Sequence, residues 1–398
     1  MKNLIKILII FSFPTLISAQ QNIGIDELIS LAVGNNYQYT LNDAQLRKAE
    51  LDRKGAVEIP KTGLFIENED FQSGNKDGVW KVGLEQEIPW PGLNKARKNY
   101  MDKLVQIHKM NRIAIEAEII RDVRKAYYEL WYLQQKKDLF QQLDSIYNNE
   151  FKAATIRYNV GDVAGLDKIS AEVKLKENRA KLSQLDKEIE IRQKELMLLT
   201  NSQIFYLPEN KKLPKLAYTE VLSAGVHPSL LVQKQEIEAN KALTEVEKQQ
   251  NHPDFSIRAF SQKYLGLKDP ISGFSFGVVF PLFGLKPMKA RIEAGEAETV
   301  AMQTGLDWQQ QKLNAQQQQA LNEVEKEEIM LDFYEESGLQ QAQAIISAAS
   351  LSYKSGEIGF AELSEFLIQA VSIKQNYLEG LNLYNQSVIE YNYLTNQN

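Results

Sequence analysis

The chain has 398 residues, no cysteine and three histidines, and its formal net charge at pH 7 is −6. The lack of cysteine excludes disulfides, thiolate metal sites and a catalytic cysteine, and the acidic balance argues against nucleic acid as a partner. His108, His227 and His252 lie far apart in the sequence and form no ligand cluster, so we expect no bound metal and no cofactor. No phosphate loop or paired His–carboxylate motif is present, and nothing in the composition indicates an enzyme.

Residues 1–20 are predicted to be a signal peptide. Lys2 and Lys6 give the positive start, residues 4–17 supply the apolar stretch, and Ser18-Ala19 precede polar residues, which is the pattern of secretory signals. A membrane anchor is the alternative, but this apolar run is short for a span. No later stretch approaches the roughly 18 apolar residues of a membrane helix. The secreted chain is therefore periplasmic, extracellular or an outer-membrane barrel.

Helices and paired strands alternate in the first half of the mature chain. A helix is predicted from Asp26, a good N-cap, to about Lys54, with an interruption at residues 34–36. Strands follow over 64–71 and 79–88, then a helix over 93–158 that breaks at Gly161 and resumes to about residue 199. Apolar residues at steps of four and three, then seven, predict a coiled-coil seam. They are Ile119, Val123, Ala126, Leu130, Leu133, Phe140 and Tyr147.

The second half has the same predicted order. A helix over 219–250, interrupted at 225–228, precedes strands over 255–262 and 274–280. The next helix runs over 287–353, breaks at Gly356 and resumes to about residue 394. Its expected seam consists of Phe366, Ala370, Ile373, Tyr377, Tyr384 and Tyr391.

The two halves also share short sequence landmarks. Tyr158 and Tyr353 lie 195 positions apart, as do Gly161 and Gly356, and Pro89 and Pro281 lie 192 apart. Such spacing predicts an internal duplication. We therefore predict a first repeat over residues 21–205, with its strand pair at 64–88, and a second over 206–398, with its strand pair at 255–281.

The strands alternate as membrane strands do. In the second strand of each pair, over 79–88 and 274–280, one face is apolar and the other is polar or small. The first strands of the pairs alternate less well, and the turns at 72–78 and 263–272 are polar. We expect the apolar side chains to face lipid: Trp80, Val82 and Leu84 in the first repeat, and Phe274, Phe276 and Val278 in the second.

Four strands are too few to close a membrane barrel. Open strand edges in lipid leave backbone groups unpaired, and the smallest membrane barrels have about eight strands. Two chains would pool eight strands and three would pool twelve; because an eight-stranded barrel is filled by its own side chains, a conduit favours three. The helices leave the barrel on one side, and the 66-residue helix over 93–158 would span roughly 100 Å. The alternative is a soluble coiled-coil protein with two incidental hairpins.

The chain resembles outer-membrane factors of the TolC type, the outer membrane efflux protein family. Two motifs carry the resemblance: residues 157–161 with Asp167, and residues 353–356 with Glu362 and Glu365, which are similar to the family's two periplasmic tip motifs. The resemblance implies a mainly α fold with a small barrel, in which a homotrimer forms a twelve-stranded barrel and a helical tunnel. It implies an exit duct for small molecules or metal cations, located in the outer membrane with its tunnel in the periplasm.

The resemblance also implies partners and sites. The partners would be outer-membrane lipid, a periplasmic adaptor and an inner-membrane transporter of the resistance-nodulation-division type. Asp167, Tyr353, Glu362 and Glu365 would form the periplasmic gate, although two glutamates on one helix face are often simply solvated. The tips that dock the adaptor would comprise Arg157, Tyr158, Asn159, Gly161, Lys354, Ser355 and Gly356.

Two further interpretations concern the branch of the family and the class of protein. The turn at residues 88–92, Ile-Pro-Trp-Pro-Gly, is similar to the branch that serves heavy-metal and cation pumps, although strand-to-helix geometry alone would also explain it. A periplasmic coiled-coil adaptor of an efflux or secretion system is the alternative function. Adaptors carry one helical hairpin within strand-rich domains, whereas this chain is predicted to have two hairpins and two short strand pairs.

Overall fold

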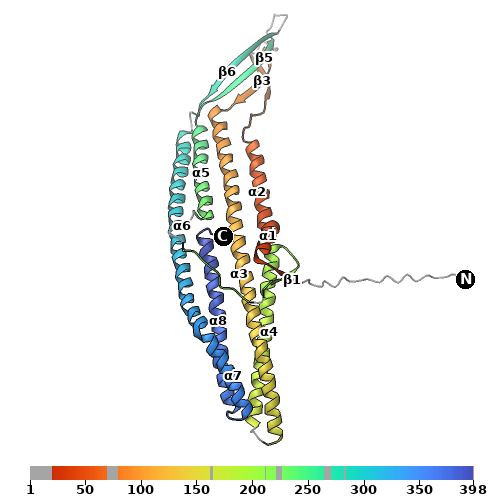
Figure 1. Ribbon diagram of the computed structural model, residues 1–398. Helices are drawn as coiled ribbons and strands as arrows, with labels where there is room; N and C mark the ends of the chain where they lie inside the picture. Colours follow the sequence, from red (N-terminus) through yellow and green to blue (C-terminus); the bar gives the residue numbers. More distant parts are fainter. Residues whose placement is uncertain are drawn as a thin grey trace, which may run out of the picture. The chain divides into compact units, whose positions relative to one another are not determined.

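A computed structural model describes residues 20–69, 79–161, 165–210, 212–220, 226–263, 270–281 and 284–397 (Figure 1). The signal peptide expected over 1–20 lies outside the described residues except for Gln20, as do the turn at 72–78 and part of the turn at 263–272. The chain divides into two compact units. Unit 1 comprises residues up to 36, 119–218 and 320–390, and unit 2 comprises 37–118, 219–319 and the residues from 391. Each unit draws residues from both predicted repeats.

Unit 2 holds a four-stranded antiparallel sheet. Its strands are β2 (Gly63–Glu69), β3 (Val79–Ile88), β5 (Asp254–Lys263) and β6 (Ile271–Val279), in the order β2-β3-β5-β6. These bounds agree with the expected strands within about three residues at each end. The expected strand positions are therefore confirmed.

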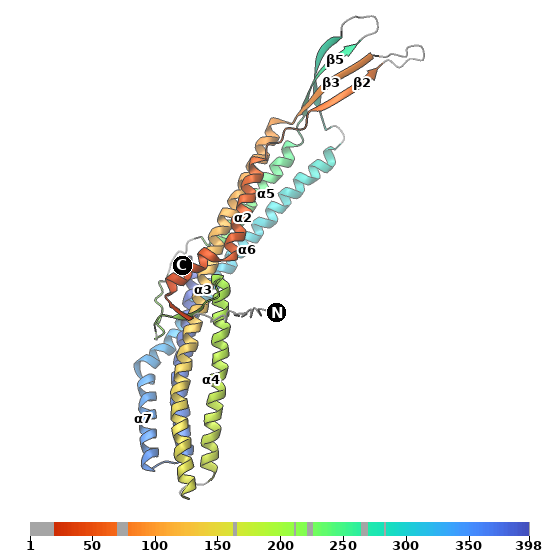
Figure 2. The ribbon, with the colours of Figure 1, turned by 90° about the vertical axis from the view of Figure 1, so that its right-hand side faces the viewer.

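The helices of unit 2 follow the order of the strands. They are α2 (Tyr37–Lys54), the first part of α3 (Pro91–Asn159), α5 (Pro228–Gln249) and the first part of α6 (Leu285–Phe333). Asn42 of α2 donates to the His108 carbonyl of α3 at 3.1 Å, and Lys103 of α3 lies 3.7 Å from Glu238 of α5. Asn240 of α5 donates to the Gly295 carbonyl of α6 at 3.0 Å. The helix order α2-α3-α5-α6 thus repeats the strand order, and Figure 2 shows the strands continuing from the ends of these helices.

Trp90 fixes the corner between β3 and α3. Its backbone N–H donates to Asp254 at 2.8 Å, its indole N–H donates to Gln249 at 3.1 Å, and its ring stacks on His252 at 5.1 Å. Leu93 packs with the buried core beside it. The proline-flanked turn therefore ties the β3–α3 corner of the first repeat to the segment between α5 and β5 in the second.

The beginning of α5 differs from the prediction. The expected helix start at residue 219 is wrong, because residues 219 and 220 have no regular structure and α5 begins at Pro228. Proline is favourable in a first helical turn, and the His227 side chain accepts from the Ser229 N–H at the N-cap. The capped proline defines the helix start more strongly than the apolar pattern upstream of it.

Unit 1 contains helices and a small sheet that the sequence did not predict. Its helices are α1 (Ile25–Asn35), the rest of α3, α4 (Gly165–Thr200), the end of α6, α7 (Leu339–Ser355) and α8 (Phe360–Leu394). β1 (Gln20–Ile23) and β4 (Phe205–Pro208) pair in parallel. The buried Tyr127 hydroxyl of α3 donates to the Ile23 carbonyl at 2.9 Å. Four-residue strands paired over such a sequence separation carry too little periodic signal to be recognised.

The expected seam of α3 is confirmed, because all seven of its residues are buried. The expected seam of α8 is wrong at Phe366, which is 42% exposed. Ala370, Tyr384 and Tyr391 of the expected seam are buried, and Leu363 and Leu367 are fully buried in place of Phe366. Leu363, Leu367 and Ala370 stand four and three positions apart, so the stripe keeps the spacing of a packed helix face but begins at another residue.

A π-helix interrupts the second long helix, which was expected to be continuous over 287–353. This segment, η1 (Tyr334–Gly338), lies between α6 and α7, and Tyr334 packs edge-on against Tyr377 of α8 at 6.4 Å. Single-turn π segments insert one extra residue into a helix. Within the described part of the chain, no helix combines the length and hydropathy needed to span a membrane.

Candidate functional site

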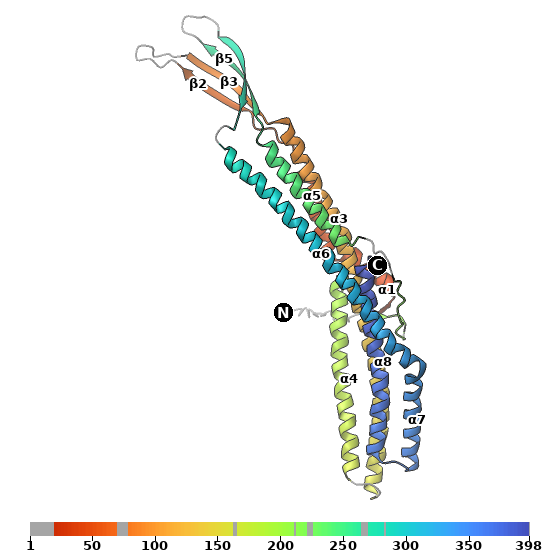
Figure 3. The ribbon, with the colours of Figure 1, turned by 90° about the vertical axis from the view of Figure 1, so that its left-hand side faces the viewer.

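Two helical hairpins of unit 1 end close together, and each ends at a glycine. Gly161 has φ +78° and Gly356 has φ +81°, values that L side chains rarely adopt. At the second tip, Gly356 N–H donates to the Tyr353 carbonyl at 3.2 Å and Glu357 N–H donates to the Ser352 carbonyl at 2.9 Å. These two bonds form a Schellman cap. Figure 3 shows the α7–α8 turn beside the end of the α3–α4 hairpin.

The predicted docking residues lie at these two tips. Tyr158 and Asn159 are exposed in the last turn of α3, and Lys354 and Ser355 are exposed in the last turn of α7. The Lys168 ammonium lies 5.2 Å from the centre of the Tyr158 ring. Arg157 is only half-exposed, because its guanidinium turns towards the other hairpin. The tips therefore offer polar and aromatic groups, while Arg157 is used in the contact between hairpins.

Tyr353 is the centre of that contact. It is only 6% exposed, and its ring lies 5.9 Å from the Arg157 guanidinium and 6.4 Å from the Phe360 ring. Burial raises the pKa of the Tyr353 hydroxyl, the nearby Glu150 carboxylate raises it further, and the hydrogen bond with Arg157 lowers it. The charge of Asp167 also raises the pKa of Tyr353, and its effect is the smallest of these. The structure thus brings Tyr353 and Asp167 into one neighbourhood, with Arg157 as the direct partner of the tyrosine.

Glu150 is a site residue that the sequence analysis did not identify. It is 7% exposed, and burial raises its pKa while the charge of Lys354 lowers it. A buried carboxylate next to the predicted gate is costly unless it is paired or protonated. Its position three turns before the end of a long helix gave no sequence signal.

The two predicted gate glutamates are exposed, whereas Tyr353 is buried. Glu362 and Glu365 are exposed in the first turns of α8, and Asp167 is half-buried in the first turn of α4. The Glu362 carboxylate accepts from the Gly359 N–H at 3.2 Å, which is the glutamate half of a capping box. Glu362 therefore has a local structural role within one chain, and a gate role for the two glutamates remains a prediction.

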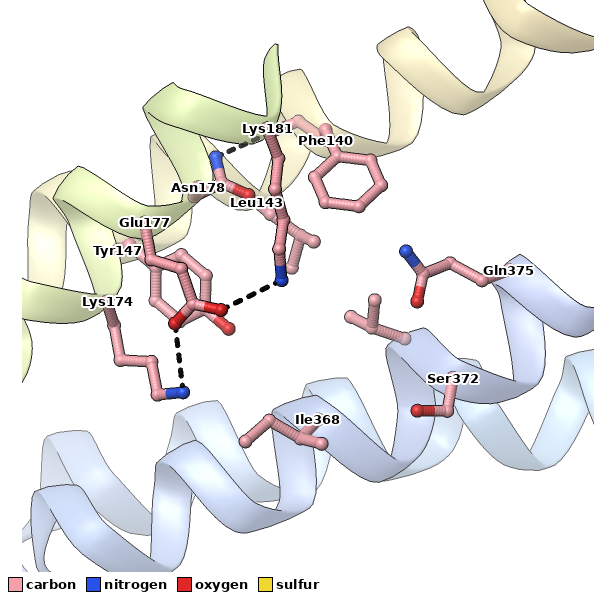
Figure 4. A pocket seen from close by; sticks show the side chains of 11 residues that line it. Phe140, Leu143, Tyr147, Lys174, Glu177, Asn178, Lys181, Ile368, Ser372 and Gln375 are labelled. Carbon is pink, nitrogen blue, oxygen red and sulfur yellow. Dashed lines mark hydrogen bonds and ion pairs between the residues drawn. The ribbon is translucent and has the colours of Figure 1, made fainter. Parts of the chain in front are cut away.

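A groove of about 220 Å³ lies between α3, α4 and α8 (Figure 4). Phe140, Leu143 and Tyr147 line it from α3, and Ile368, Ser372 and Gln375 line it from α8. From α4, Glu177 is paired with Lys181 at 2.9 Å and with Lys174 at 3.3 Å. Glu177 thus pairs with both lysines of this groove, and all three charged groups come from α4.

The predicted lipid-facing residues share one face of the sheet. In the strand register, Leu84 is opposite Ala259 and Ala259 is opposite Phe274, while Ile66 is opposite Val82. The six predicted side chains are between 41% and 84% exposed. The opposite face carries an ion-paired cluster in which Arg258 bonds Glu85 at 2.8 and 3.0 Å. One chain therefore exposes an apolar sheet face beside a charged one.

The described residues form neither a nucleophile elbow nor a metal centre. Residues 273–277 read Gly-Phe-Ser-Phe-Gly, which fits the nucleophile-elbow pattern, but all five lie inside β6 and not at a strand-to-helix turn. Among the residues that the structure describes, no group of three or more His, Cys, Asp or Glu side chains is placed to hold a metal ion.

The family model described as "Outer membrane efflux protein" matches residues 68–202 and 223–396. Among solved structures, the CmeC outer membrane channel of Campylobacter jejuni is 14% identical, with a TM-score of 0.77 over 93% of this chain and 85% of that one. The outer membrane protein VceC of Vibrio cholerae is 14% identical, with a TM-score of 0.75 over 93% and 95%. CusC is 13% identical, with a TM-score of 0.76 over 94% of both chains. No curated protein matches the sequence.

Proposed function

Because the chain belongs to the outer membrane efflux protein family, we propose that three copies of it form the exit duct of a tripartite efflux pump. The observation that carries the proposal is the sheet of unit 2. Its edge strands β2 and β6 each have a partner on one side only among the described residues, and one face of the sheet exposes a group of large apolar side chains. Backbone edges and apolar faces of this kind require a partner surface.

A closed barrel formed by several copies would satisfy both requirements. The edge of β6 in one copy would pair with the edge of β2 in the next, and the apolar face would contact lipid. Because four strands come from each chain, three copies would supply twelve and leave a bore open. The ion-paired face would then line the interior.

The helices of unit 2 support the same arrangement. Their outer members are α2 and α6, and both expose apolar side chains along their length. Tyr37, Leu41 and Leu51 lie on α2, and Val300 and Trp308 lie on α6. Since helix order and strand order coincide, a neighbour that pairs with the edge of β6 would bring its α2 towards α6. These exposed residues would then be covered.

The duct would work with two partners. A periplasmic adaptor would dock on the hairpin tips at residues 157–161 and 354–356, and an inner-membrane transporter of the resistance-nodulation-division type would supply small molecules or metal cations. The gate would consist of Tyr353, Asp167, Glu362 and Glu365, with Arg157 added as the hydrogen-bonding partner of Tyr353.

Extraction from the outer membrane tests the assembly. The protein is expressed with its signal sequence, the outer membranes are solubilised in mild detergent, and the mass of the protein is measured by native mass spectrometry. A trimer in the outer-membrane fraction is the expected result. A monomer, or a protein released by osmotic shock with the periplasmic contents, would exclude the duct.

A further inference from the structure

Two phenylalanines and two glycines form one row across the charged face of the sheet. The strand register places Phe65 opposite Gly83, Gly83 opposite Phe260, and Phe260 opposite Gly273. Ring and glycine therefore alternate over β2, β3, β5 and β6. Both rings are half-buried and Gly83 is buried, although this face also carries the ion pair of Arg258 with Glu85.

The rings occupy the space that side chains at the glycines would fill. A Cβ added at Gly83 would lie 2.6 Å from Phe65 Cζ, and one added at Gly273 would lie 2.9 Å from Phe260 Cζ. Side chains in strands usually stand roughly perpendicular to the sheet, whereas a ring this close to the neighbouring backbone lies along it. Aromatic side chains that cover a cross-strand glycine are a known stabilising device in sheets.

Two ion-paired cations lie over the Phe65 and Phe260 rings. The Arg258 guanidinium lies 5.2 Å from the centre of the Phe65 ring and is fixed by Glu85. The Lys81 ammonium lies 6.0 Å from the centre of the Phe260 ring and pairs with Glu69. Each cation lies over a ring face, where the electrostatic attraction to the ring is strongest. Both rings are thus kept between a glycine and a charged side chain.

We propose that this row sets the bore of the duct. The inference rests on the proposed function, in which the charged face lines a barrel. Gly83 and Gly273 let Phe65 and Phe260 lie flat on the wall, so that the interior stays open at the level of the row. A ring displaced from its glycine would project into the bore and reduce the maximum size of molecule that can pass.

Gly273→Ala is the variant chosen to displace one ring. The three atoms nearest the new Cβ would all belong to the Phe260 ring, at 2.9, 3.1 and 3.6 Å. Gly83 is not used, because a Cβ there would also lie 2.5 Å from the Ala259 carbonyl oxygen. Gly277→Ala is the matched control, since it makes the same change in the same strand and on the same face, where the added Cβ meets the Ser256 side chain and no ring.

Single cysteines report on either side of the row, because the chain has none of its own. Ile271 lies two residues from Gly273 towards the turns, and Ser275 lies two residues from it towards the helices. Both are on the charged face, and both are exposed. Ile271→Cys and Ser275→Cys are labelled in intact cells with membrane-impermeant maleimides of graded size. A maleimide that enters from outside passes the row before it reaches the second position.

We expect Gly273→Ala to abolish labelling of Ser275→Cys by the larger maleimides and to leave labelling of Ile271→Cys unchanged. Phe260→Ala should admit larger maleimides to Ser275→Cys, the double variant should behave like Phe260→Ala, and Gly277→Ala should behave like wild type. If Gly273→Ala fails to assemble, Phe260→Ala alone decides the outcome.

An unchanged size limit in Gly273→Ala or Phe260→Ala trimers would overturn the role of the row. The mass of each variant is measured first, so that this failure is separated from failure of the proposed function. A wild-type protein that is not trimeric would overturn the duct itself, and with it the bore that the row is proposed to set.

Discussion

Arg157, in the last turn of the first hairpin's long helix, holds Tyr353 of the second hairpin, with its guanidinium 5.9 Å from the tyrosine ring centre. A hydrogen bond to the hydroxyl accompanies this contact. The two residues join the hairpin tips inside one chain. Any widening at the tips has to break or stretch this pair, so the pair provides a direct test of the gate.

Removal of the hydrogen bonds at Tyr353 should open the tip. Tyr353→Phe with Asp167→Ala, and separately Arg157→Ala, should raise single-channel conductance in planar bilayers, because the closed arrangement loses charge-assisted bonds. Tyr158→Phe is the control, since it removes an exposed hydroxyl from the same tip. Conductance equal to wild type in both test variants would place the gate elsewhere.

Removal of the two exposed carboxylates should affect cation block and not closure. If Glu362 and Glu365 from three copies surround a narrow mouth, their charges attract cations. Glu362→Ala with Glu365→Ala should then abolish block by multivalent cations and leave the conductance low. Glu362→Gln with Glu365→Gln removes both charges and keeps a side-chain oxygen that can cap α8. If multivalent cations still block this variant, the two glutamates belong to the solvated face of α8.

Glu150 should make the stability of the tip depend on pH. Burial raises the pKa of the Glu150 carboxyl above its ordinary value, so the folded tip binds the proton more tightly than the unfolded chain does. This stability is fully present below the unfolded pKa and is lost as the pH rises through the raised folded pKa. Hydrogen exchange at residues 150–161, corrected for intrinsic rates, should therefore be slower at low pH.

Glu150→Gln should remove this pH dependence, whereas Glu357→Gln, which changes an exposed carboxylate in the α7–α8 turn, should keep it. Equal profiles for the wild type and Glu150→Gln would show that the buried carboxylate does not govern the tip.

Charges on the two faces of β6 should have opposite consequences for membrane insertion. Phe276→Arg places a cation on the apolar face and should cost about 2–4 kcal/mol at mid-bilayer depth. Ser275→Arg places the same cation on the neighbouring, opposite face and should be tolerated. Heat-modifiable mobility and refolding into vesicles compare the two variants, and Val82→Arg repeats the test in β3. Equal assembly of all three variants would refute the lipid-facing assignment.

Crosslinking should identify the end of the molecule that meets the adaptor. Photoreactive residues at Asn159 and Ser355, which are exposed at the two tips, should capture the periplasmic adaptor, whereas one at Gln72 should not. Capture from the turn at residues 72–78 alone would show that the orientation is inverted.

The sequence by itself determined the elements, the family and the general function. Alternating side chains placed β3 at 79–88 to the residue, and glycines with positive φ ended both hairpins where expected. These features are local, and a period or a single glycine is enough to specify them. The mainly α fold, the membership of the outer membrane efflux family, the role in efflux and the outer-membrane location are confirmed.

Only the tertiary structure decided which side chains meet across those elements. In α8, the apolar spacing did not decide that Leu363 and Leu367 are buried and Phe366 is exposed. The parallel pair β1–β4 and the π-helix at 334–338 had no periodic signal. The same is true of the pair Arg157–Tyr353 and of the row from Phe65 to Gly273. Each of these depends on packing between segments distant in sequence, where register and close contact select the partner and local propensity does not.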